Sequence, residues 1–194
     1  AVFAADPDTE IHIFEKNEKP GKKLFITGKG RCNFTNLCDN EELLGNVVSN
    51  PRFMFSAFND FNSYDAIDFF ESLGVKTKVE RGRRAFPMSD HSSDIISAMV
   101  KAIKNRHVKL HLDSEVKSIV TKDGAIKGVV LSDGKEESAD AVIVAAGGLS
   151  YPSTGSTGDG YRFAQECGHT VNKTRPALVP LEIKENTAKM LQGL

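Results

Sequence analysis

The chain has 194 residues, of which 40% are hydrophobic and 26% charged, as in an ordinary globular protein of one domain or slightly more. A net charge of −1 argues against a nucleic acid or a membrane surface as partner, and no apolar run reaches the length of a bilayer span. Three cysteines are too few for a disulfide framework, so we expect a reducing compartment, the cytoplasm.

The predicted elements of the first half alternate between strands, loops and helices. The opening residues, AVFAADPDTE, read as the end of a helix broken at Asp6-Pro7-Asp8. Apolar periodicity then predicts the remaining elements in chain order: a strand at 10–15, a Gly/Lys-rich loop at 17–36, a helical segment at 40–73 ended by Gly74, a strand at 75–80, a basic loop at 81–90 and a helix at 91–105 with a Ser or Asp cap.

The second half predicts mostly strands. After a strand at 108–112, the turn sequences KDGA and SDGK separate three β runs, which indicates an antiparallel meander. The run DAVIVAAGG at 140–148 has the continuous apolar pattern of a buried parallel strand. A helix follows from Asp159 or Gly160. The order predicts an α/β fold, a three-layer parallel sheet with an antiparallel β-meander inserted in one crossover.

Glu15 ends the first predicted strand. In dinucleotide-binding folds an acidic residue at this place binds a ribose, about 20 residues after a glycine-rich phosphate turn. Counting back from Glu15, that turn falls before residue 1, so we interpret the chain as an excerpt of a longer protein. The alternative is a solvated glutamate at the start of a loop.

The loop at 17–36 combines glycines, cations and amide side chains. Glycine lets the backbone approach a ligand closely, and cations beside backbone amides suit a pyrophosphate. The alternative is an ordinary surface loop. The residues concerned are Gly21, Gly28 and Gly30, then Lys22, Lys23 and Arg31, and finally Asn33, Thr35 and Asn36.

Two further segments are typical of nucleotide sites. The run VIVAAGG leaves backbone amides at the carboxyl end of its predicted strand, the edge at which α/β sheets bind ligands. The run STGDGY places glycines and Asp159 at a helix N-terminus, where N–H groups face an anion. Asp159 taken alone is better explained as an N-cap.

Other reactive side chains have simpler explanations. We assign no histidine to catalysis, and we expect His91 to cap a helix. Cys32 is either a redox thiol or, more simply, a packed residue. The arginines of RGRR at 81–84 fit a solvated surface, with contact to an NADPH phosphate as the alternative. No metal site is expected, because Cys32 and Cys38 have no second pair of cysteines or cluster of histidines nearby.

Two motifs together resemble the BaiN-like flavoproteins, the aminoacetone oxidase family of NAD(P)/FAD-dependent oxidoreductases. They are IFEKNEKPGKKLFITGKGRCNFTN and AAGGLSYPSTGSTGDGYRFAQECGHT, and the resemblance extends over nearly the whole chain. It implies a glutathione-reductase-type, Rossmann-like FAD domain with a second domain inserted. Residues 1–178 would be a partial FAD-binding domain and residues 179–194 the start of the second, substrate domain.

The resemblance also implies the cofactor contacts. Glu15 would bind the adenosine ribose, Val116 the adenine through its backbone, and the loop would follow the cofactor toward the flavin. The full implied set is Glu15, Lys16, Lys23, Thr27, Gly28, Gly30, Arg31, Cys32, Asn33, Thr35, Asn36, Val116, Ala145, Ala146, Gly147, Gly148, Ser150, Tyr151, Gly158, Asp159 and Gly160.

The sequence departs from the family pattern at both ends. It lacks the glycine-rich first turn and the C-terminal return of the FAD domain, so we expect residues 1–194 alone to bind FAD weakly and to be inactive.

The expected function of the parent protein is FAD-dependent hydride or electron transfer, with NAD(P)H as the expected donor and a small molecule as substrate. Oxidase and reductase chemistry both remain open, and no catalytic side chain is assigned. The alternatives are a flavoprotein of the tRNA-modifying type and a non-catalytic FAD-binding module.

Overall fold

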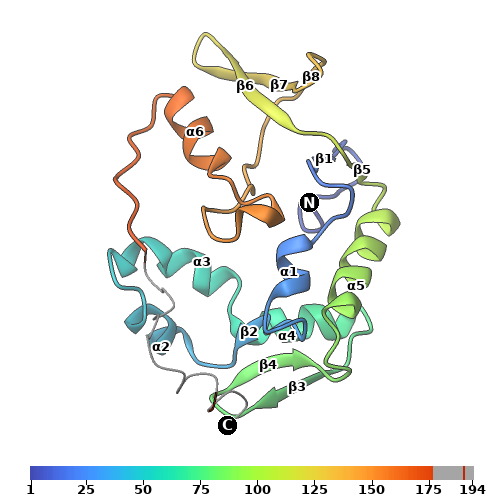
Figure 1. Ribbon diagram of the computed structural model, residues 1–194, viewed down its shortest axis with the longest axis vertical. Coiled ribbons are helices and arrows are strands. Elements are labelled where there is room, and N and C mark those ends of the chain that lie inside the picture. Colours follow the sequence, from blue (N-terminus) through green and yellow to red (C-terminus); the bar gives the residue numbers. More distant parts are fainter. Residues whose placement is uncertain (177–189, 191–194) are drawn as a thin grey trace.

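The computed structural model describes residues 1–176 and residue 190, and its strands form three separate sheets (Figure 1). The predicted start of a second domain at 179–194 lies outside the described residues, apart from Met190. The sheets are a parallel pair, β1 (His12–Phe14) with β5 (Lys109–His111); an antiparallel sheet in the order β2 (Thr35–Asn36), β4 (Arg84–Pro87), β3 (Thr77–Glu80); and a meander of β6 (Val116–Lys122), β7 (Ala125–Leu131) and β8 (Glu136–Ser138).

Six helices accompany these sheets in the described part of the chain. They follow from amphipathic patterns, and in the longest one the apolar residue Ile95 is completely buried. Among the described residues no helix is both long and apolar enough to cross a membrane. The helices are α1 (Lys22–Ile26), α2 (Asn40–Gly45), α3 (Phe55–Asp60), α4 (Ser63–Ser72), α5 (Ser92–Asn105) and α6 (Asp159–Glu166), with single 3-10 turns at Pro51–Met54 and Pro152–Thr154.

The parallel pair positions the site. β1 and β5 lie in parallel register, with His12 opposite Lys109 and Phe14 opposite His111. The backbone N–H of Glu15 continues the ladder by donating to the carbonyl of His111 at 2.9 Å. Two parallel strands need a long connection, and here it includes α5, as the helix pattern predicted. The predicted α/β fold with an inserted antiparallel meander is therefore confirmed.

A small apolar core lies between α1, α4 and α5. Cys32, Val75 and Ile95 form its buried centre, and Leu24, Phe34, Phe70 and Ala98 pack around it. The Cys32 side chain is 0% exposed, and burial raises the pKa of its thiol. A buried, neutral thiol is a poor nucleophile, so the packed interpretation of Cys32 fits the structure and the redox interpretation does not.

The predicted meander is confirmed, and glycine stands at two of its positions for different physical reasons. Asp123 and Gly124 form the first hairpin turn with φ of 53° and 74°, which an Asp-Gly pair tolerates. Gly128 lies in the middle of β7 with φ 148°, and a Cβ there would lie 2.0 Å from the carbonyl oxygen of Glu137. Only glycine therefore allows β8 to pair with β7 at this point.

Four predictions about the first half are wrong in detail. Residues 1–6 form turns and no helix. The helical segment at 40–73 is interrupted, because Phe61 is extended and the Asn62 side chain accepts from the N–H groups of Tyr64 and Asp65, starting a new helix. The predicted loops at 17–36 and 81–90 contain α1, β2 and β4, short elements that only sheet pairing and packing stabilise. The other elements lie close to their predicted positions.

The predicted buried strand at 140–148 is also wrong in the described structure. These residues form no strand, and Ile143 is 80% exposed. A parallel strand exists only with a hydrogen-bonded neighbour. Within residues 1–176, none of the backbone amides from 141 to 150 donates a hydrogen bond, so this segment has no such neighbour.

The two meander glycines give a matched test of the fold. Replacing Gly128 by alanine places a methyl group against the Glu137 carbonyl, and we expect it to lower the free energy of unfolding by about 2–4 kcal/mol. Gly124→Ala adds the same methyl group, but into open space, so only the strain of the left-handed backbone lowers the free energy of unfolding, by about 1–2 kcal/mol. Urea denaturation monitored by circular dichroism measures both variants. Equal losses would contradict the assigned close approach.

Candidate functional site

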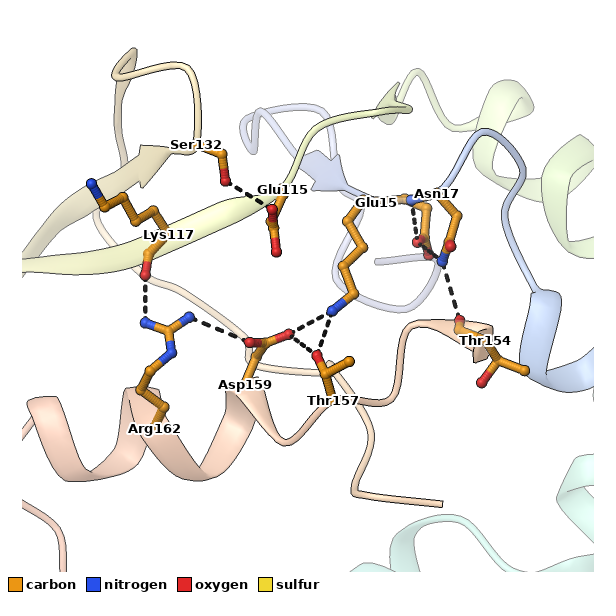
Figure 2. A network of polar contacts seen from close by, with 10 residues as sticks. Glu15, Asn17, Glu115, Lys117, Ser132, Thr154, Thr157, Asp159 and Arg162 are labelled. Atoms are coloured by element: carbon orange, nitrogen blue, oxygen red, sulfur yellow. Dashed lines mark hydrogen bonds and ion pairs between the residues drawn. The ribbon is translucent and has the colours of Figure 1, made fainter. Parts of the chain in front are cut away.

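Two segments that are far apart in the sequence meet at the carboxyl end of β1, and we call residues 15–23 and 145–160 together the cradle (Figure 2). The Asn17 side-chain amide donates to the Thr154 carbonyl at 3.2 Å, across 137 residues. Farther along, the Lys23 ammonium donates to the Ser150 carbonyl at 2.7 Å, across 127 residues. The structure thus brings together two of the segments that were predicted to bind the cofactor.

Glu15 presents a carboxylate at the predicted position. It is half-buried directly after β1, and its Oε1 accepts from the backbone N–H of Asn17 at 2.9 Å and from the Asn17 side chain at 2.6 Å. Within residues 1–176 and 190, Oε2 accepts no hydrogen bond. Asn17 therefore fixes the orientation of the carboxylate and leaves one oxygen able to accept from a hydroxyl group.

The strongest contact in the cradle is an ion pair between Lys16 and Asp159. Lys16 Nζ lies 2.7 Å from Asp159 Oδ2 and 2.7 Å from Thr157 Oγ1, and the two charged side chains are 23% and 20% exposed. The Lys16 ammonium, helped by the Thr157 hydroxyl and Arg162, lowers the pKa of Asp159. The pair connects the end of β1 to the start of α6.

Asp159 is not the N-cap that the sequence favoured. The cap is Gly158, with φ 87°, and Asp159 is the first helical residue of α6. Its second oxygen faces Arg162, whose guanidinium also donates to the Lys117 carbonyl at 2.5 Å (Figure 2). Because Lys117 follows Val116 in β6, these contacts hold the meander beside α6, where the resemblance had implied an adenine contact through Val116.

The glycines of the second segment allow close contacts within the chain that a side chain would prevent. A Cβ on Gly147 would lie 3.0 Å from Ser156 Oγ, and one on Gly155 would lie 2.8 Å from Asn17 Nδ2. The Gly158 N–H donates to the Gly148 carbonyl at 3.1 Å, which closes the turn before α6. In the described structure the amides of residues 145–148 donate to no protein acceptor, so they are available to a ligand.

The second half of the glycine-rich loop lies elsewhere. Arg31 contacts Glu80 at 2.5 Å and Asp90 at 2.6 Å, and Lys78 lies 2.6 Å from Asp90. These contacts attach Arg31 to the β2–β4–β3 sheet and raise its pKa. Its side chain is therefore saturated by carboxylates within the chain, and a contact between Arg31 and a cofactor remains a prediction.

The polar neighbours of Arg31 are engaged in the same way. The Asn36 amide donates to the Gly82 carbonyl at 2.8 Å. With its side-chain amide turned so that the nitrogen faces the carbonyls of Thr35 and Ala85, Asn33 donates to them at 3.0 and 3.2 Å. Thr27 Oγ1 donates to the Lys23 carbonyl at 2.8 Å. The loop therefore consists of a half at the cradle, which includes Lys23, and a half that organises the small sheet.

The remaining side-chain predictions have separate outcomes. His91 occupies the N-cap position of α5, but its side chain makes no capping hydrogen bond. Because His91 is the cap residue, the expected Ser or Asp cap is not observed at this helix. The arginines at 81, 83 and 84 are exposed, in agreement with a solvated surface, and Arg83 pairs with Glu42. Sequence reasoning missed four residues that hold the cradle together, namely Asn17, Thr154, Thr157 and Arg162.

The parallel pair, the carboxylate after β1 and the amides of residues 145–148, which are unpaired among the described residues, have the arrangement that is typical of a dinucleotide-binding α/β domain. A model of the HI0933-like protein Rossmann domain matches residues 1–191, and the chain belongs to this FAD-binding Rossmann family. The expectation of this fold is therefore confirmed.

Curated relatives match the chain along its whole length. It is 34% identical to the 3-dehydro-bile acid delta(4,6)-reductase of Clostridium scindens over 100% of this chain and 46% of that protein. It is 31% identical to the ribosomal RNA dihydrouridine synthase of Escherichia coli over 100% of this chain and 47% of the relative. The chain thus spans about half the length of these relatives. A solved flavocytochrome c3 fumarate reductase in its open conformation is 27% identical over 54% of this chain and 24% of that one, with a TM-score of 0.43.

The ion pair at the cradle predicts a particular pH dependence. Because the pKa of Asp159 is lowered in the folded state, its stabilisation is complete above the ordinary value of 3.8 and is lost as the pH falls through the folded value. We expect Asp159→Asn to cost about 1–2 kcal/mol at pH 7 and progressively less below pH 4.

Asp68→Asn provides the control for this measurement. Asp68 is exposed on α4 and makes no ion pair within the described residues, so the substitution changes the charge alone. Chemical denaturation of both variants between pH 7 and pH 3 gives the comparison. A cost of Asp159→Asn that stays constant down to pH 3 would contradict the assigned pair.

Proposed function

We propose that this chain is the cofactor-binding part of an FAD-dependent reductase of the BaiN-like type, which uses NAD(P)H to reduce a small unsaturated molecule. The observation that carries the proposal is the free oxygen of Glu15 at the carboxyl end of a parallel strand pair. Ribose hydroxyls are hydrogen-bond donors, so this oriented acceptor matches them.

The rest of the cradle also fits a dinucleotide. The amides of residues 145–148, which donate to no acceptor among the described residues, are donors that suit phosphate oxygens. The same cradle contains the ammonium groups of Lys16, which contacts Thr157, and Lys23, which contacts the Ser150 carbonyl. When bound, FAD would supply transfer of a hydride from NAD(P)H to one carbon of a double bond, while a solvent proton completes the other carbon. The chain itself would bind and orient the cofactor. Lys16 and Asp159 would keep the two halves of the cradle at a constant separation.

The names of the relatives favour a reductase over an oxidase. One is named a delta(4,6)-reductase and the other a dihydrouridine synthase, and each name describes a product that carries more hydrogen than its substrate. Both relatives cover this chain completely at 31–34% identity. We therefore infer that the natural protein which carries this chain adds hydrogen to a carbon–carbon double bond.

A second candidate function is reduction of a base in RNA. Two relatives, from Escherichia coli and Haemophilus influenzae, are named ribosomal RNA dihydrouridine synthases, and each is 31% identical to this chain. The net charge of −1 means that the chain as a whole does not attract RNA electrostatically. Arg81 and Arg84 are nevertheless exposed and have no carboxylate partner among the described residues. Formation of dihydrouridine in an RNA transcript would favour this alternative, and reduction of small enones alone would favour the first.

Glu15 gives a direct test of cofactor binding. In the natural protein that carries this chain we expect Glu15→Ala to weaken FAD affinity about 10-fold, because a hydrogen bond to a charged acceptor is lost. The matched control is Glu136→Ala, since Glu136 is an exposed glutamate on β8. Titration of apoprotein with FAD, followed by flavin fluorescence, measures the affinity. An unchanged affinity in Glu15→Ala would remove the ribose assignment.

The electron donor is tested separately. We expect the purified natural protein to show flavin absorbance between 300 and 550 nm, which bleaches without oxygen when NADH or NADPH is added. The nucleotide that bleaches faster names the donor. A flavin that neither nucleotide reduces would contradict the reductase proposal and favour another reductant, whereas a protein without flavin would contradict the cofactor itself.

A further inference from the structure

We propose that Tyr151 is a specificity-determining residue on which the planar, unsaturated ring of the substrate stacks. This inference rests on the proposed function, because it assumes a reducible ring at the flavin end of the cradle. The observations that carry it are the backbone conformation of Tyr151, the exposure of its ring and the position of Lys23.

The backbone of Tyr151 is held in a conformation that tyrosine avoids. Its φ and ψ are 55° and 69°, in the left-handed region, which is a true outlier for a bulky side chain. Pro152 follows, and a residue before proline favours extended backbone. Such strain persists only where the surrounding structure enforces it, and it is frequent at functional sites.

Hydrogen bonds on both sides enforce this conformation. The Ser150 carbonyl accepts from Lys23 Nζ at 2.7 Å. The Tyr151 carbonyl accepts from the backbone N–H of Thr154 at 2.9 Å and from the Thr154 hydroxyl at 2.7 Å. Thr154 in turn accepts from Asn17 through its own carbonyl, so the turn is joined to Glu15 and the end of β1.

The strain does not serve to bury the ring. The Tyr151 side chain is 65% exposed, so the burial of apolar surface that usually offsets the ordering of a large aromatic side chain is missing in the described structure. A turn that needed only a left-handed residue would accept glycine or asparagine without this cost. The conformation instead presents a flat aromatic surface at one end of the cradle.

Lys23 determines which kind of ring fits that surface. Its Nζ lies 4.7 Å from the centroid of the Tyr151 ring, in a cation–π contact that occupies one side. The positive charge disfavours a second cation and favours a neutral or anionic partner on the remaining exposed surface. A conjugated carbonyl ring, either in a small enone or in a pyrimidine base, meets this requirement because it is flat and uncharged.

The other tyrosines in the described structure lack this combination. Tyr161 lies within α6 and Tyr64 within α4, both in right-handed helix and neither with a lysine over its ring. Tyr64 is 52% exposed, close to the exposure of Tyr151, and it lies far from the cradle along the chain. Tyr64→Ala is therefore a matched control for the loss of an exposed tyrosine ring.

The experiment compares Tyr151→Ala, Tyr151→Phe and Tyr64→Ala in the natural protein that carries this chain. The probes are cyclohex-2-enone and a uridine-containing oligonucleotide, each with the nucleotide donor that bleaches the flavin. We expect Tyr151→Ala to raise KM for the accepted probe about 10–100-fold with little change in kcat, as for loss of ring stacking. Tyr151→Phe keeps the ring and restores KM, and Tyr64→Ala leaves it unchanged. The probe that responds identifies the source of the ring.

Two additional measurements separate the failure of this inference from failure of the proposed function. FAD affinity is determined for each variant, and a loss in Tyr151→Ala that parallels the rise in KM would overturn the substrate role in favour of a cofactor contact. Saturation-transfer NMR detects binding of each probe without donor or turnover. If the protein holds no reducible flavin, an NMR signal that disappears only in Tyr151→Ala still supports stacking. An equal signal or an equal KM in all variants overturns it.

Discussion

The ion pair between Lys16 and Asp159 is the contact on which the arrangement of the site depends. Lys16 Nζ and Asp159 Oδ2 lie 2.7 Å apart where the end of β1 meets the start of α6. Arg162, which contacts both Asp159 and the Lys117 carbonyl, extends this connection to the meander. The pair is about four-fifths buried, so it is less screened by solvent than the exposed ion pairs of this protein. Without it, the hydrogen bonds that connect the two halves of the cradle among the described residues would be those of Asn17 and Lys23 to backbone carbonyls and that of Lys16 to the Thr157 hydroxyl.

The charges of residues 16–31 are divided between two tasks. Lys16 and Lys23 reach across to residues 150–159, whereas Arg31 is held by Glu80 and Asp90 at the antiparallel sheet. The division follows from α1, the short helix that contains Lys23 and ends before Arg31, because its apolar residue Leu24 packs on the small core. One stretch of sequence thus supplies both the cations of the cradle and the attachment of the antiparallel sheet.

Several features of the fold, and Glu15 in the site, could be predicted from local sequence because they follow local rules. Glu15 ends an alternating strand, Gly74 follows a helix with φ 86°, and Asp123-Gly124 forms a hairpin turn. The helix at 92–105 follows from its apolar spacing. Short elements such as β2 and β4 escaped prediction, since two to four residues carry too little periodicity and their hydrogen bonds come from distant partners.

The sequence by itself determined the α/β class, the meander, the carboxylate directly after β1 and the family motifs, because each depends on residue types at short spacing. Only the tertiary structure decided that Asp159 pairs with Lys16 instead of capping α6, that Arg31 is saturated within the chain, and that residues 140–148 pair with no strand among the described residues. It alone also joined Lys23 to Tyr151. The contacts among these outcomes span 49 to 143 residues, and local spacing carries no information about which distant charge or strand becomes a neighbour.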